Sequence, residues 1–354
     1  MHGSKQGGRV ASIVICLDRQ IWRTFLTLLA IAATNTWSSI VCGEEPLTLH
    51  RETVIRFATE SEATKAFQSV DRFIRSMSEF DLQCRLDRSS ANTDEFLEFS
   101  ANQYVPWTEE QKRKIVPVVQ SLEKRLARFN LPLPKTVLLV QTSGKIEANA
   151  AYCRENAIML PPRFINAPAK SLESLLAHEL FHVLSSHNPD LRYRLYRIIG
   201  FQSCPPIKLP AALMARKITN PDAPQLDCIL YVVVDGETVP ATPFLWAKSD
   251  YEPGQGKTFF DYLQFRLLVL KPAGDGFEPL FRNGEPWFIR PRRPDLYWNI
   301  GINTEYIIHP EEILADNFKA LVMKSPVNSP RITQAMLREL QQSTGGNETF
   351  ERRR

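Results

Sequence analysis

Two histidines, His178 and His182, stand four positions apart in segment 177–182 (AHELFH). On a helix this spacing puts both imidazoles on one face, about one turn apart, so both can bind one metal ion. Glu179 then lies beside the open coordination position. In zinc sites of this HExxH type, neutral imidazoles hold the ion and the adjacent carboxylate takes a proton from water. One catalytic Zn²⁺ is therefore the predicted cofactor, with Glu179 as the general base.

A third ligand is needed, because HExxH supplies two and a catalytic zinc usually has three. Glu312 and Asp316 are four residues apart in a predicted helix. If Glu312 binds the metal, Asp316 can accept the outward N–H of a ligating histidine and fix its tautomer. Glu311 is the neighbouring alternative, but the residue four positions after it is Ala315, so it lacks this support.

A hydrolytic site also needs a hydrogen-bond donor for the oxyanion that develops in the transition state. Tyr306 and His309 are the candidates, because both lie just before Glu312 in the sequence. The alternative interpretation is that Tyr306 packs in the core and that His309 only caps the helix carrying Glu312.

At these two motifs the chain resembles the gluzincin class of zinc metallopeptidases, whose signature is HExxH followed by ExxxD. The run AHELFHVL at 177–184 and the run EILAD at 312–316 look like the AHELxHVL and ExxAD motifs of the prenyl-protein endopeptidase relatives. The second run also resembles the ExxSD form of thermolysin.

The resemblance implies a role for each matching residue. His178, His182 and Glu312 are implied as zinc ligands, with Glu179 as general base and Asp316 as the support of a ligating histidine. It further implies that the strand before the HExxH helix, within 149–160, holds the peptide substrate.

The elements that must position these residues follow from hydrophobic periodicity and capping. Segment 136–141 (TVLLVQ) predicts a strand, and 148–160 predicts a hairpin or a bent edge strand. Apolar residues at steps of three and four predict one helix over 63–77 and another from Ser171 to Asn188 that carries HExxH. Thr108 opens a capping box and a helix to about Phe129.

These elements predict an α+β protein of zincin-like architecture, with a small mixed sheet and an HExxH active-site helix. The predicted organisation is a signal peptide (1–43), a helical N-terminal region (44–134), a zincin core with edge strand and HExxH helix (135–201), a β-rich insertion (202–300), a third-ligand helix (301–330), and a C-terminal helix with a polar tail (331–354).

The first 43 residues have the pattern of a secretory signal: a basic start, an apolar stretch over 25–33, and small residues before Glu44. The protein is therefore expected to be secreted or otherwise extracytoplasmic, in the periplasm or at the cell surface. An uncleaved anchor is the alternative, but polar residues interrupt the apolar stretch. No stable membrane span is expected after cleavage.

Four cysteines follow the leader, an even number that in an exported chain indicates disulfides. The predicted pairs are Cys204–Cys228 and Cys84–Cys153, and four buried free thiols are the alternative.

The charge balance argues against a nucleic-acid partner. The 354 residues contain 43 Lys and Arg and 39 Asp and Glu, a net charge of +4, without a basic patch. We therefore expect an exported zinc metallopeptidase that acts on a peptide or protein substrate. The alternatives are a catalytically inactive zincin-like binding or structural protein, and a zinc hydrolase of a non-peptide substrate.

Overall fold

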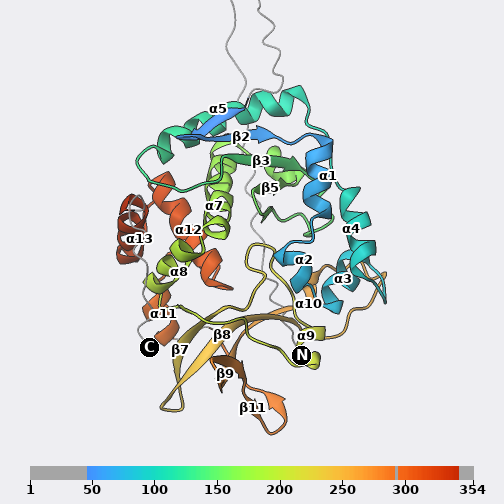
Figure 1. The fold of residues 1–354 in the computed structure, drawn as a ribbon, viewed down its shortest axis with the longest axis vertical. Helices are drawn as coiled ribbons and strands as arrows, with labels where there is room; N and C mark the ends of the chain where they lie inside the picture. Colours follow the sequence, from blue (N-terminus) through green and yellow to red (C-terminus); the bar gives the residue numbers. More distant parts are fainter. Residues whose placement is uncertain (1–45, 292–293, 343–354) are drawn as a thin grey trace, which may run out of the picture. The chain divides into compact units, whose positions relative to one another are not determined.

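The structure, a computed structural model, describes residues 46–291 and 294–342, and it is an α+β protein as predicted (Figure 1). Its first sheet contains β1 (Leu47–His50), β2 (Thr53–Phe57), β3 (Thr136–Gln141), β4 (Tyr152–Arg154) and β5 (Ala157–Leu160). The strand order is β1-β2-β3-β5-β4. β2, β3 and β5 are parallel, whereas β1 and β4 pair antiparallel at the two ends. The hairpin predicted within 148–160 is confirmed, and it leaves β4 as an edge strand.

Helices cover both faces of this sheet because side chains alternate along its strands. Val137 and Leu139 of β3 belong to the core that includes α5 (Glu109–Leu126) and α7 (Ala169–His187). Val140 faces the opposite side. The helices of that side are α1 (Glu60–Gln68), α2 (Arg72–Ser76), α3 (Glu79–Leu86) and α4 (Thr93–Ala101).

The helix that carries the HExxH motif starts after Pro168, two residues before the predicted cap at Ser171. It ends at Asn188, where α8 (Pro189–Ile198) begins. Asn188 Nδ2 donates to the carbonyls of Leu184 and Pro132, and so satisfies an end carbonyl of α7. On α5 the predicted capping box is present, with Thr108 and Gln111 bonded reciprocally.

The predicted β-rich insertion forms a second sheet. Its strands are β6 (Gln202–Ser203), β7 (Cys228–Val234), β8 (Glu237–Ala247), β9 (Leu263–Ala273), β10 (Gly276–Pro279) and β13 (Phe288–Ile289). The order is β10-β9-β8-β7-β6, all antiparallel, and β13 pairs with β9. The remaining elements of this region are β11 (Phe281–Arg282), β12 (Glu285–Pro286), α9 (Ala211–Ala215), α10 (Phe259–Tyr262) and α11 (Pro294–Ile300).

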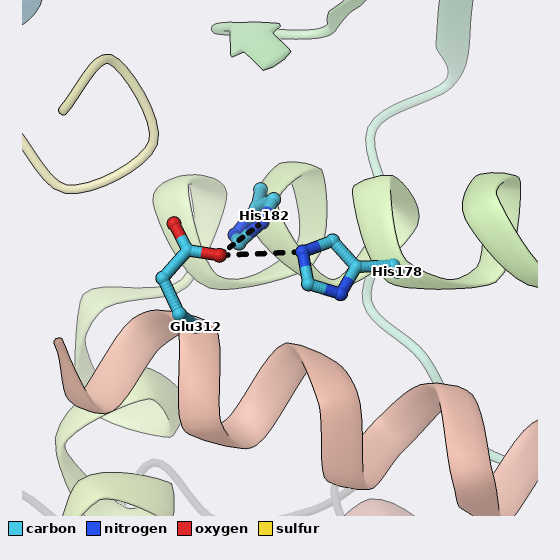
Figure 2. A group of neighbouring side chains, drawn as sticks. All are labelled: His178, His182 and Glu312. Carbon is cyan, nitrogen blue, oxygen red and sulfur yellow. Dashed lines mark hydrogen bonds and ion pairs between the residues drawn. The ribbon is translucent and has the colours of Figure 1, made fainter. Parts of the chain in front are cut away.

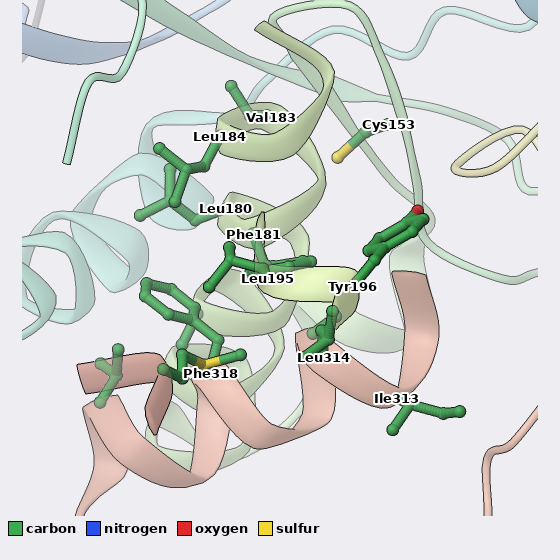
Figure 3. Packing of buried hydrophobic residues seen from close by; sticks show 14 of the residues in the cluster. Cys153, Leu180, Phe181, Val183, Leu184, Leu195, Tyr196, Ile313, Leu314 and Phe318 are labelled. Carbon is green, nitrogen blue, oxygen red and sulfur yellow. The ribbon is translucent and has the colours of Figure 1, made fainter. Parts of the chain in front are cut away.

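Two helices close the described chain, α12 (Pro310–Met323) and α13 (Pro330–Gln342). α12 packs on α7 through Phe318, a fully buried residue (Figure 3). Its ring centroid lies 5.8 Å from that of Phe181 on α7 and 5.9 Å from that of Phe129. These aromatic contacts hold the two helices that carry the predicted metal ligands.

Several predictions need correction. The N-terminal region is not purely helical, because β1 and β2 belong to the first sheet. The single helix predicted over 63–77 is two helices, since the Asp71 side chain caps a new helix by accepting from Ile74 N.

The predicted leader, 1–43, lies outside the described residues. Within the described part of the chain, we find no helix with the length and apolar character needed to cross a membrane.

The predicted disulfides are absent, and all four cysteines are free thiols. Cys153 Sγ points at the carbonyl of Glu179, 3.2 Å away, and Cys228 Sγ lies 3.8 Å from His309 Nε2. Each of these thiols therefore has a partner other than the predicted cysteine.

Replacing Phe318 with Ala should lower the free energy of unfolding by about 3–5 kcal/mol, because the lost ring leaves a cavity between α7 and α12. Phe318→Leu should cost clearly less, since it refills most of that volume. Urea denaturation of the two variants tests this. Equal and small losses would show that the helix crossing does not depend on this ring.

Candidate metal centre

His178 and His182 of α7 point toward Glu312 of α12, and one oxygen of Glu312 faces both rings (Figure 2). The Oε2 atom lies 3.3 Å from His178 Nε2 and 3.6 Å from His182 Nε2. Glu312 sits in the first turn of α12, where the helix dipole favours a negative charge. The structure therefore brings together the three predicted ligands from segments far apart in the sequence.

The other nitrogen of each imidazole is held by a carboxylate. His178 Nδ1 lies 3.0 Å from Asp316 Oδ1, and His182 Nδ1 lies 3.2 Å from Glu311 Oε1. An ionised carboxylate only accepts, so each Nδ1 carries the proton that it donates. In the neutral ring each Nε2 then presents a lone pair, as metal ligation requires.

Both supporting carboxylates are themselves fixed. Asp316 accepts from the Thr304 hydroxyl and from Lys319 Nζ. Glu311 is fully buried and accepts from the hydroxyls of Ser185 and Tyr196, the latter at 2.6 Å. From the sequence we predicted Asp316 as the support of a ligating histidine, but we considered Glu311 only as an alternative third ligand. Its actual contact, with His182, depends on how α12 crosses α7, which sequence spacing does not specify.

The separations between Glu312 and the two imidazoles fit a zinc ion. Ligand atoms about 2.0–2.1 Å from a tetrahedral zinc lie about 3.3–3.4 Å from one another. The two histidine-to-Glu312 separations, 3.3 and 3.6 Å, are close to that value. The donor set, two imidazoles and one carboxylate, is also the one found in catalytic zinc sites that keep a fourth position open.

The electrostatics of the cluster favour a cation. Burial by itself would lower the pKa of His178, but hydrogen bonds to Asp316 and Glu312 outweigh it and raise that pKa to about 9. Burial would raise the pKa of Glu312, yet the two neighbouring histidines lower it to about 2. The same convergence of negative groups that attracts protons attracts a divalent metal ion.

Glu179, the predicted general base, is buried at this centre. Burial raises the pKa of its carboxyl, while the charges of His182 and His178 act in the opposite direction. Cys153 Sγ of β4 lies 3.4 Å from Glu179 Oε2 and 3.2 Å from the Glu179 carbonyl oxygen, so these two oxygens share its single thiol hydrogen. The base and the edge strand are thus in direct contact.

The two predicted oxyanion donors are placed differently. Tyr306 is 45% exposed, and partial burial together with the charges of Glu312 and Asp222 raises the pKa of its phenol, which stays a proton donor. His309 is buried, accepts from Glu311 N at 3.1 Å through Nδ1, and directs Nε2 at Cys228. His309 therefore caps α12 and does not face the ligands, which corrects its predicted role.

Two further residues reach the centre from the insertion, and the sequence did not indicate either. Asn220 Nδ2 donates to Glu312 Oε1 at 2.6 Å, and Asp222 Oδ1 accepts from Cys153 N at 2.7 Å. The side-chain atoms that could bind a metal lie within 4.8 Å of one another in Asp222, Glu179 and Cys153. Neither residue belongs to a spaced motif, so neither could be predicted from the sequence.

No family model matches the chain, and no curated protein or solved structure matches it. The function is therefore inferred from the geometry of the site.

We predict two different outcomes for the three carboxylates of α12. Glu312→Gln should lose zinc on dialysis against a mild chelator, because it removes a charged ligand. Asp316→Asn and Glu311→Gln should bind zinc about 10–100-fold more weakly, because each leaves one ligating histidine poorly oriented. Chelator competition on the purified proteins measures this.

Asp275→Asn, in the exposed turn between β9 and β10, is the control and should bind zinc like the wild type. Full zinc retention by Glu312→Gln would mean that the third ligand is another residue.

Proposed function

We propose that the protein is a zinc-dependent peptidase with a zincin-like active site. The observation that carries the proposal is the convergence of His178, His182 and Glu312, with Glu179 buried beside them. A site that is only structural uses closed coordination and has no need for a carboxylate base beside an open position. This argues against the alternative of an inactive binding protein.

When bound, zinc supplies a Lewis acid that polarises a carbonyl and activates water at neutral pH. Glu179 accepts the proton as the water oxygen bonds to the peptide carbonyl carbon. Glu179 then returns this proton to the amine nitrogen as the C–N bond breaks. The phenol of Tyr306 is the proposed donor to the oxyanion in between.

The edge strand β4 supports a peptide as the substrate. Cys153 N–H bonds to Asp222 rather than to β5, so it points away from the sheet. An extended peptide can add to such an edge through main-chain hydrogen bonds. Because Cys153 also touches Glu179, a peptide bound there would pass directly over the base. A non-peptide substrate would have no use for this edge.

The order of the elements also supports the proposal. An edge strand, an HExxH helix and, after the insertion, a helix with the third ligand occur in this order, as the gluzincin resemblance implies. With the signal-like leader, we further propose that the peptidase works outside the cytoplasm.

Glu179→Gln should keep zinc at near-native stoichiometry, since all three ligands remain, and should lower peptide cleavage by about 10²–10⁴-fold through loss of proton transfer. Digestion of a broad peptide library, read by mass spectrometry alongside metal analysis, measures both quantities. Glu98→Gln, on an exposed position of α4, is the matched control. Cleavage by Glu179→Gln at the wild-type rate would contradict the peptidase proposal.

A further inference from the structure

A short segment of the insertion lies over the metal centre. We call residues 220–225 the strap. It is anchored at both ends: Thr219 N and its hydroxyl donate to Asp81 of α3, and the carbonyl of Leu226 accepts from Ile207 N. Between these anchors the chain makes a compact turn, in which Asp222 N donates to Asn220 Oδ1 at 3.0 Å.

The strap makes two hydrogen bonds to the site from this turn. Asn220 donates to Glu312 Oε1, the carboxylate oxygen that does not face the histidines. Asp222 accepts from Cys153 N, the outward N–H of the edge strand. Asp222 therefore occupies the main-chain donor that an added peptide strand would need.

Cavities lie on both sides of the strap. One, of about 340 Å³, is lined by Cys153, Arg154, His182, Arg192, Asp222 and Pro224. The other, of about 60 Å³, is lined by Ala150, Tyr152, Ile218, Asp222, Phe260 and Tyr306. Asp222 lines both cavities, so the strap borders each of them.

We propose that the strap closes the substrate cleft of the resting protein, with Asp222 holding the place of a substrate carbonyl on Cys153 N–H. The substrate side of this inference rests on the proposed peptidase function. Binding of a peptide then exchanges one acceptor for another at the same donor. The strap competes with substrate for this donor. Removal of the Asp222 acceptor should therefore lower KM, by a larger factor the smaller the fraction of wild-type molecules that are open, and should leave kcat unchanged.

Cys153 provides a readout that does not depend on activity. Its thiol is buried beside the strap, and it should react with iodoacetamide only when the strap opens. Cys84 is also buried but packs with Phe80 and Tyr251, so it serves as the internal reference. Peptide mapping of the zinc-loaded full chain gives the alkylation rate of each thiol.

Two variants of Asp222 distinguish the effect of strap closure from the effect of its negative charge. Asp222→Ala removes the acceptor and should speed alkylation of Cys153, relative to Cys84, by about tenfold or more. Asp222→Asn removes the negative charge that disfavours the Cys153 thiolate, but its amide oxygen can still accept from Cys153 N. Its rate of Cys153 alkylation should therefore stay close to that of the wild type. Asp250→Ala, at an exposed position outside the strap, is the control. Thermal unfolding of each protein confirms that the variants are folded.

The strap proposal is overturned if Asp222→Ala leaves Cys153 alkylation unchanged, or if Asp222→Ala and Asp222→Asn raise it equally. It is also overturned if Asp222→Ala lowers kcat at an unchanged KM, because Asp222 would then act in the chemistry. Faster alkylation in Asp222→Ala alone, with no peptide cleaved by any variant, would retain the strap and reject the peptidase function.

Discussion

At the crossing of α7 and α12, two imidazole nitrogens and a carboxylate oxygen face a common point in a buried site. Such a cluster is stable only with positive charge at its centre, from protons or from a metal ion, because buried negative groups repel one another. The surrounding architecture serves this constraint. Asp316 and Glu311 orient the rings, and Lys319, Ser185 and Tyr196 hold those two carboxylates in turn.

The two sheets contribute to the site in different ways. The first sheet ends in β4, which brings the outward N–H and the thiol of Cys153 next to Glu179. The insertion with the second sheet supplies the strap, which reaches both β4 and Glu312. The region that was predicted as a β-rich insertion thus contacts the centre directly. Thr219 anchors the strap to α3, and Leu226 anchors it to Ile207 within the insertion.

Local patterns predicted what depends on local geometry. The four-residue spacing of His178 and His182 is a property of one helix, and the Thr108 capping box fixes a helix start, so both could be anticipated. Glu311 could not be assigned, because adjacent residues on a helix face different directions and the partner helix decides which one meets His182. Asp222 belongs to no periodic pattern, and only the tertiary fold brings it to Cys153. The break between α1 and α2 was missed because the apolar period continues across it.

We propose that His178, His182 and Glu312 hold one zinc ion. X-ray absorption at the zinc edge, with metal analysis of the purified full chain, tests this most directly. We expect one zinc per chain with nitrogen and oxygen ligands only, at about 2.0–2.2 Å, and two imidazole contributions. A scatterer at about 2.3 Å, the distance of a cysteine sulfur, or a chain that binds no zinc at all would contradict it.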